Sequence, residues 1–411
     1  MPSASRDTRF VGRAGVLLCA IGLATCLGAD DTLAESRRIP LREAVAAAEH
    51  LPELLAAQAG ERGAAAAVRV AGAFGEPSVG FQTNSVTARE AASVSWALPL
   101  ARGPRVAAAR AEAVVSARSR TEALAAARAL LRVAWFSLAA AEQRAQAVAE
   151  RALRAERNAE AVGAMFEAGR VSRLDQVRAR ADLALARAER GSAEDARATA
   201  AARLGLLMGL AADGTLATAD PGPPEPEPDL TTYLERARAT APGVLVREAQ
   251  AAGALARFTL AKRGRWPILS LSTGAEWNDP TQPGTNKWVG IDVGIPLGAG
   301  AAADVAAADR DRAAALFARE RRLAEDAAQA AWRGARSARL RLLAIEAEAL
   351  PAVREAADLT RLAYREGRAD LFRVLEAERA LGDALAVRAD ALEAWGLAFA
   401  DLKQLGGEDT P

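Results

Sequence analysis

The sequence predicts a mostly α-helical protein with a small β part, built from two copies of one structural half. Apolar residues make up 51% of the 411-residue chain, but aromatic residues make up only 4%. Alanine, the best helix former, dominates the apolar share, which favours long, closely packed helices over a thick core. Stretches 104–166 and 299–364 contain no proline except Pro104 and Pro351, so each predicts a helix far longer than those of globular domains. Two shorter stretches alternate with a period of two and predict β-hairpins.

The duplication is inferred from landmarks that recur in the same order. The paired landmarks are Pro52 and Pro242, Pro77 and Pro267, Trp135 and Trp332, and Phe166–Arg170 and Tyr364–Arg368. A unit of about 190 residues is too long for a solenoid repeat and indicates two pseudo-symmetric halves. We expect repeats over 35–220 and 230–405, with a proline-rich linker at 221–229 and a tail at 406–411.

The N-terminus has the pattern of an export signal over residues 1–34. Basic residues precede an apolar stretch, 14–27, which is too short for a membrane anchor. Cys26 ends a marginal lipoprotein motif, so lipidation of Cys26 is the alternative to ordinary cleavage. Cys19 also lies in this segment, so the mature chain after ordinary cleavage would have neither disulfides nor thiolate metal sites.

Within the first repeat, 41–73 predicts two short helices broken near Pro52. A β-hairpin is expected at about 77–99, where Val79 and Phe81 alternate with small or polar residues. A long helical hairpin follows over about 104–212.

The second repeat carries a clearer hairpin, at about 267–297. Leu269 to Trp277 and Val289 to Leu297 each alternate apolar residues with small or polar ones. Strands of this length match the ~9–11 residues of a transmembrane β-strand. An ordinary half-buried hairpin is the alternative, but export and the second matching hairpin favour the membrane. Trp266 has the wrong parity for the apolar face, so Pro267 is expected to mark a strand start or a bulge.

A second helical hairpin is expected over about 299–405. Both long helices end at a glycine turn, Gly169 or Gly367, and the chain returns as helix over 172–210 and 370–405. Glycine adopts positive φ at such helix ends without a Cβ clash.

No catalytic chemistry is evident. His50 is the only histidine, and it sits in a helix break, where a surface or capping role is the expected one. The sequence has no phosphate loop, metal-spaced cluster or nucleophile elbow, and its net charge of +1 gives no nucleic-acid footprint. We therefore expect no enzymatic activity, no cofactor and no nucleic-acid partner.

Four strands per chain cannot close a barrel by themselves. The smallest membrane barrels have about eight strands, and open sheet edges are not tolerated in lipid. Several copies must therefore share one barrel, and long antiparallel helix pairs on its periplasmic side would continue it as a tunnel.

Motifs across nearly the whole mature chain resemble the TolC-type outer membrane efflux proteins. They are Leu51–Leu54 with its partner at 241–244, the strand entry Arg265–Leu271, the strand exits at 97–100 and 294–297, and Tyr364–Arg368 followed by Phe372–Ala377. The resemblance implies a homotrimer in the outer membrane, with a twelve-stranded barrel and a periplasmic helical tunnel. It implies the exit duct of a tripartite efflux or secretion system, fed by a periplasmic adaptor and an inner-membrane pump of RND type.

Two questions stay open after this resemblance. The segment Arg102–Arg105 is loosely similar to the heavy-metal branch, in which case the chain would conduct metal rather than ligate it. The alternative function is a periplasmic adaptor or coiled-coil scaffold, but an adaptor should not be internally duplicated and a scaffold needs no β-hairpins.

The resemblance also implies two sites. The turns with Gly169, Arg170, Gly367 and Arg368 would form the periplasmic tip that meets the adaptor; a purely geometric helix cap is the alternative for each glycine.

Near that tip, Asp175 and Glu376 match positions where related channels place acidic residues around the constricted end. Arg373 departs from the family, because a base replaces the tunnel's other usual acid. A periplasmic gate formed by Asp175, Arg373 and Glu376 is therefore expected, against the alternative of an ordinary i,i+3 surface pair between Arg373 and Glu376.

Overall fold

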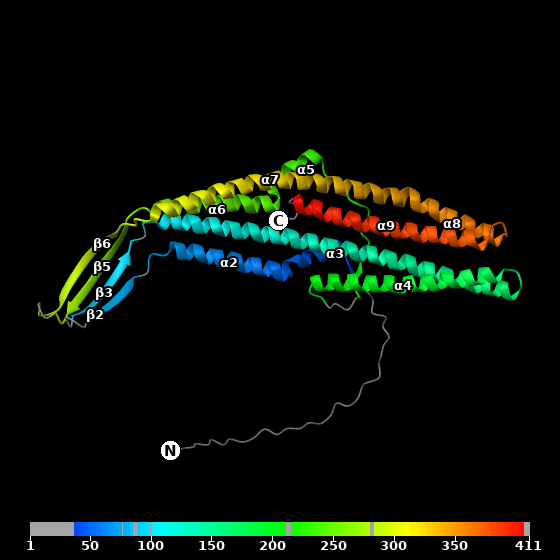
Figure 1. The fold of residues 1–411 in the computed structure, drawn as a ribbon, viewed down its shortest axis with the longest axis horizontal. Coiled ribbons are helices and arrows are strands. Elements are labelled where there is room, and N and C mark those ends of the chain that lie inside the picture. Colours follow the sequence, from blue (N-terminus) through cyan, green and yellow to red (C-terminus); the bar gives the residue numbers. More distant parts are fainter. Residues whose placement is uncertain are drawn as a thin grey trace, which may run out of the picture. The chain divides into compact units, whose positions relative to one another are not determined.

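The structure is a computed structural model that describes residues 37–75, 77–84, 89–98, 100–210, 215–279 and 283–406. The expected signal peptide over 1–34 and the lipidation of Cys26 fall outside the described residues. Long helices fill the described part, with a four-stranded sheet at one end and two helical turns at the other (Figure 1).

The chain passes twice through the same order of elements. The first pass has α1 (Leu41–Ala46), a 3₁₀ turn (Ala47–His50), α2 (Pro52–Gly72), β2 (Ser78–Asn84), β3 (Arg89–Ala97), α3 (Arg102–Glu167) and α4 (Arg173–Leu207). The second has α5 (Leu230–Thr240), α6 (Pro242–Arg263), β5 (Ile268–Trp277), β6 (Asn286–Gly294), α7 (Ala299–Ala344), a π-helical segment (Ile345–Ala349), α8 (Leu350–Arg365) and α9 (Leu371–Leu405). Pro52 and Pro242 each open a helix, where the missing N–H costs no hydrogen bond.

The helix expected over 299–364 is divided by the π-helical segment Ile345–Ala349. Pro351 follows directly, near the start of α8. Proline has no N–H and its ring crowds the carbonyl four residues earlier, so the helix widens at this point instead of continuing with a regular ladder.

The sheet is antiparallel throughout, in the order β2-β3-β5-β6. Its register aligns Val79 with Val94, Val94 with Thr273 and Thr273 with Val289. The apolar residues of the predicted strands therefore share one face of the sheet. Nothing in the described chain covers that face, since Val289 on it is 76% exposed. Strand β5 begins at Ile268, just after Pro267, which leaves Trp266 outside the strand and removes the parity conflict.

A second pairing was not expected from the sequence. Strand β1 (Arg38–Ile39) pairs in parallel with β4 (Ala217–Thr218). This two-residue pairing joins the start of the described chain to the segment that follows α4. Strands so short carry too little alternation to be recognised in a sequence.

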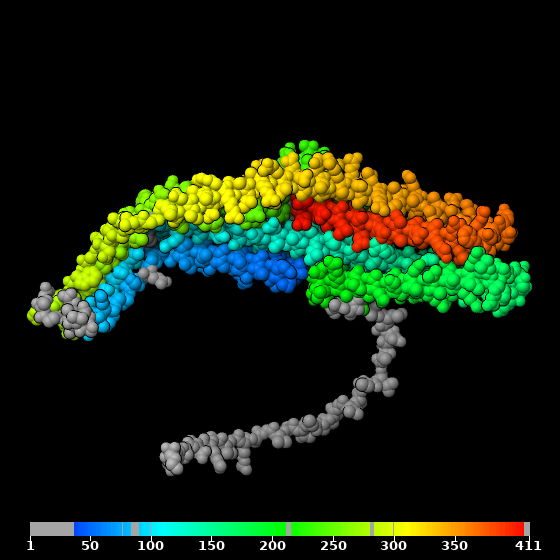
Figure 2. Space-filling view, in the orientation of Figure 1, coloured from blue at the N-terminus to red at the C-terminus, as the bar shows by residue number. Residues whose placement is uncertain are grey.

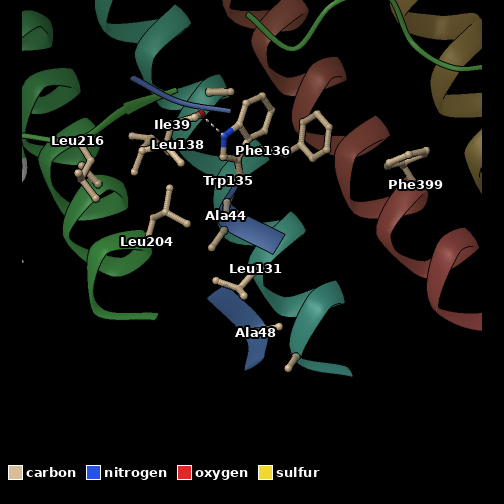
Figure 3. Packing of buried hydrophobic residues seen from close by; sticks show 14 of the residues in the cluster. Ile39, Ala44, Ala48, Leu131, Trp135, Phe136, Leu138, Leu204, Leu216 and Phe399 are labelled. Carbon is tan, nitrogen blue, oxygen red and sulfur yellow. Dashed lines mark hydrogen bonds between the residues drawn. The ribbon is translucent and has the colours of Figure 1, made fainter. Parts of the chain in front are cut away.

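The landmark tryptophans of the two passes make matching hydrogen bonds. Trp135 is buried, and its indole Nε1 donates to the carbonyl oxygen of Ile39 at 2.8 Å (Figure 3). Trp332 donates in the same way to Pro228, also at 2.8 Å. Ile39 and Pro228 each lie two residues before the first helix of their pass, so each tryptophan holds that entry segment against a long helix.

The largest core cluster surrounds α3, which packs against α2, α4, α6 and α9. Phe136 of α3 meets Trp395 of α9 edge to face, with ring centroids 5.2 Å apart. In the space-filling view, α2 and then α4 run along one side of the body, and α7 continues into α8 along the other (Figure 2).

Helix α3 is long and apolar enough to cross a membrane. However, 67% of its apolar 18-residue window is buried inside the protein, which agrees with the place of α3 at the centre of the helical body.

Candidate functional site at the helical turns

The two predicted tip turns have the same backbone structure. Gly169 has φ of 70° and Gly367 has φ of 73°. The Gly169 N–H donates to Phe166 and the Arg170 N–H to Met165, at 2.9 and 2.8 Å. These paired bonds form a Schellman motif, which satisfies the last carbonyls of α3.

The turn between α8 and α9 repeats this arrangement. The Gly367 N–H donates to Tyr364 at 3.0 Å, and the Arg368 N–H donates to Ala363 at 2.8 Å. Apart from the adjoining residues, no described atom lies within 4 Å of a Cβ built at either glycine. Glycine is therefore required by the backbone conformation and not by a close neighbour. Arg170 is exposed, and Arg368 forms an ion pair with Glu366.

Asp175, a predicted gate residue, takes part in a helix cap. The Ser172 side chain accepts from the Asp175 N–H at 3.1 Å, and the Asp175 carboxylate accepts from the Ser172 N–H at 3.2 Å. This capping box satisfies free donors at the start of α4. Burial, and then the nearby Asp175 carboxylate, raise the pKa of Tyr364 above its ordinary value, so Asp175 lies within electrostatic reach of the other turn.

The other two predicted gate residues lie on the first turns of α9. Asp370 caps this helix by accepting from the Arg373 N–H at 3.0 Å. The Arg373 and Glu376 side chains are both exposed, and no ion pair joins them in the described structure. Glu376 instead lines a groove of about 500 Å³ between α4 and α9, together with Arg178 and Arg379.

Two buried carboxylates further from the turns were missed by the sequence analysis. Asp182 of α4 is 5% exposed and lies 3.3 Å from Arg151 and 3.4 Å from Arg379. It therefore connects α4 with α3 and α9. A buried carboxylate is stable only when it is paired in this way.

Glu378 forms the second of these clusters. It is also 5% exposed, and it lies 2.7 Å from Arg154 of α3 and 2.9 Å from Arg361 of α8. Charged residues spaced along one helix predict solvated i,i+4 surface pairs. Asp182 and Glu378 depart from that expectation, because their partners lie on other helices, which no spacing within one helix reveals.

Among the described residues, no three His, Cys, Asp or Glu side chains lie together in a group that could hold a metal ion.

No protein-family model and no curated protein matches this chain. Solved structures do match. The CmeC outer membrane channel of Campylobacter jejuni has a TM-score of 0.74 at 15% identity, covering 89% of this chain and 85% of that one. CusC, described in connection with transmembrane channel formation, has a TM-score of 0.73 at 17% identity, covering 89% and 92%. The MtrE outer membrane channel of Neisseria gonorrhoeae has a TM-score of 0.71 at 17% identity, covering 89% and 88%. The predicted resemblance to TolC-type channels is thus confirmed at the level of the fold.

Proposed function

We propose that this chain is an outer membrane channel of TolC type, the exit duct of a tripartite efflux or secretion system. It would receive substrate from a periplasmic adaptor and an RND-type inner-membrane pump, and it would have no enzymatic activity. The observation that carries the proposal is the antiparallel sheet at one end of the helices, with one exposed apolar face. Three of its strands, Arg89–Ala97, Ile268–Trp277 and Asn286–Gly294, have the length needed to cross a bilayer when tilted.

The sheet edges support assembly as a trimer. Among the described strands, β2 and β6 each pair on one side only. In lipid an unpaired edge leaves backbone N–H and C=O groups without partners, so β6 of one copy would pair with β2 of the next. Three copies would close a twelve-stranded barrel, and the two passes of each chain would act as pseudo-equivalent repeats.

The two turns would form the adaptor-docking tip. Support comes from their matching Schellman geometry, their place at the end of the body away from the sheet (Figure 1) and the lack of described neighbours at the Cβ positions of Gly169 and Gly367. Arg170 and Arg368 would contribute to the contact with the adaptor.

A periplasmic gate formed by Asp175, Arg373 and Glu376 remains part of the proposal. Glu376 is the stronger member, because its carboxylate is exposed and faces a groove, whereas Asp175 already has a role in the cap. In planar bilayers, Glu376→Gln should lower the preference for cations, and Asp175→Asn should do so less. Unchanged current and reversal potential in both variants would make these residues ordinary surface and capping groups.

The substrate stays open. The descriptions of the matched channels name no substrate, so the comparisons do not favour the heavy-metal branch suggested by Arg102–Arg105.

The decisive functional experiment is fractionation combined with efflux. The full chain, expressed in a host that lacks its own exit ducts, should be recovered with outer membrane barrel proteins and should restore efflux with its cognate pump and adaptor. Recovery as a soluble periplasmic protein would favour the adaptor or scaffold alternative instead.

A further inference from the structure

A cavity of about 300 Å³ lies where the sheet meets the helices. Its lining includes the last residues of β3, the start of β5 and the adjoining ends of α3 and α6. Three arginines contribute to it, Arg102, Arg105 and Arg263, and none of the described lining residues is acidic.

These three arginines carry positive charge that the described chain does not neutralise. The Arg102 Nε donates to the Gly72 carbonyl at 2.7 Å, and the Arg105 Nε donates to the Ala71 carbonyl at 3.1 Å. Both bonds go to the end of α2 and none of the three arginines forms an ion pair with a described carboxylate. By contrast, the nearby Arg257 and Arg265 do have acidic partners, Glu112 at 2.8 Å and Asp304 at 3.8 Å.

Aromatic rings accompany the same charges. The Arg263 guanidinium lies 3.9 Å from the centre of the Trp266 ring, and that of Arg102 lies 4.5 Å from the centre of the Phe74 ring. Both rings are more than half exposed. Tryptophan with arginine is typical of the boundary between lipid and water, where the ring lies among headgroups and the cation meets phosphate.

We propose that this cavity binds the phosphate headgroup of an anionic phospholipid in the periplasmic leaflet of the membrane. The proposal rests on the proposed function, because the apolar sheet face must lie in a bilayer for this junction to meet headgroups. Guanidinium groups bind phosphate oxygens through paired N–H donors. The exposed Leu98 and Ile268 beside the cavity would contact the first part of an acyl chain. Because the described lining is basic and carries no carboxylate, a net-negative headgroup is favoured over a zwitterionic one.

Arg263 is the residue to change, since Arg102 and Arg105 also cap α2. The full chain would be reconstituted in nanodiscs with equal amounts of phosphatidylglycerol and phosphatidylethanolamine, and co-purifying lipid would be counted by native mass spectrometry. We expect phosphatidylglycerol to be retained preferentially and Arg263→Gln to reduce that preference about fivefold. Arg180→Gln, the same charge change on exposed α4 near the turns, should leave it unchanged.

Added inorganic phosphate distinguishes a lipid site from a free-phosphate site. It should not displace the retained lipid; displacement at low millimolar concentration would overturn the lipid assignment. Equal retention of the two lipids would also overturn it, as would an Arg263→Gln variant that keeps the full preference. If Arg263→Gln instead alters only anion conductance, the cluster faces the lumen and the proposal is wrong. Failure of the chain to enter bilayers at all would refute the proposed function and is seen separately, before any lipid is counted.

Discussion

Single glycines set how closely the long helices approach. A Cβ built at Gly396 of α9 would lie 2.2 Å from Cγ of Phe136 on α3. The absence of a side chain therefore lets the Phe136 ring pack directly on the α9 backbone. This contact joins the first and last long helices of the chain in the largest core cluster.

Gly396→Ala should destabilise the protein by about 1–3 kcal/mol, because Phe136 must leave its preferred position. Gly163→Ala is the matched control: this glycine is also helical, but no described atom outside its own helix turn lies within 4 Å of its Cβ position. The control should be neutral or stabilise by up to about 1 kcal/mol. Chemical denaturation measures both, and equal effects would show that the α3–α9 contact is looser than described.

Stability should depend on pH through Glu122. Burial and then the Glu320 charge raise the pKa of Glu122 above 4.5, although Arg247 opposes this. A raised folded pKa gives stability that is present at low pH and is lost as pH rises from about 4.5 through the folded value. Glu122→Gln should therefore reduce the decline of Tm across this window.

Glu325→Gln is a control whose effect on the pH dependence of stability should have the opposite sign, because the pKa of Glu325 is lowered rather than raised. A hydrogen bond from Arg238 lowers the pKa of Glu325 below 4.5, so its contribution is present above that pH and is lost as pH falls. Parallel pH profiles for the wild type and Glu122→Gln would contradict the assignment of a raised pKa to Glu122.

At the scale of elements, the tip turns and the end of α4 share one geometry. Gly209 has φ of 70°, and its N–H and that of Leu210 donate back into α4 as in the tip turns. Valine at any of these three glycines should cost roughly 1–2 kcal/mol of backbone strain. Of these three glycines, Gly169 and Gly367 lie at the proposed docking tip, whereas Gly209 lies at the other end of α4.

We therefore expect the double substitution Gly169→Val with Gly367→Val to abolish efflux and adaptor crosslinking while the channel still assembles and inserts. Gly209→Val imposes similar strain elsewhere and should leave efflux intact. Normal efflux and crosslinking in the double variant would show that the tip assignment is wrong.

The sequence predicted most elements because their signals are local. The alternation of apolar residues predicted the four sheet strands, and the proline-free stretches with their glycine turns predicted α3, α4 and α9. The predicted boundaries of these elements lie within a few residues of those in the structure. The capping box is also encoded locally, since Ser172 and Asp175 have the expected spacing, whereas the family resemblance implied only a gate role for Asp175. The buried carboxylates Asp182 and Glu378 could not be predicted, because they depend on which helices become neighbours.

At the scale of the whole molecule, the two faces of the sheet should respond differently to charge. Ile291 is 73% exposed on the apolar face, and Ile291→Arg should cost about 2–4 kcal/mol if that face meets the bilayer midplane. Asp292→Lys, on the opposite face, should cost much less. Gly290 is a poor comparison, since a Cβ there would lie 3.1 Å from the Ser272 hydroxyl and 3.5 Å from the Trp288 ring. Refolding into lipid vesicles measures both variants, and equal costs would argue against a lipid-facing apolar side.

The central claim is that several chains complete one barrel. Native mass spectrometry of the full chain, extracted from outer membranes in mild detergent, tests it most directly. We predict a trimer, because β2 and β6 need partners from neighbouring copies. A stable monomer under the same conditions would contradict the account.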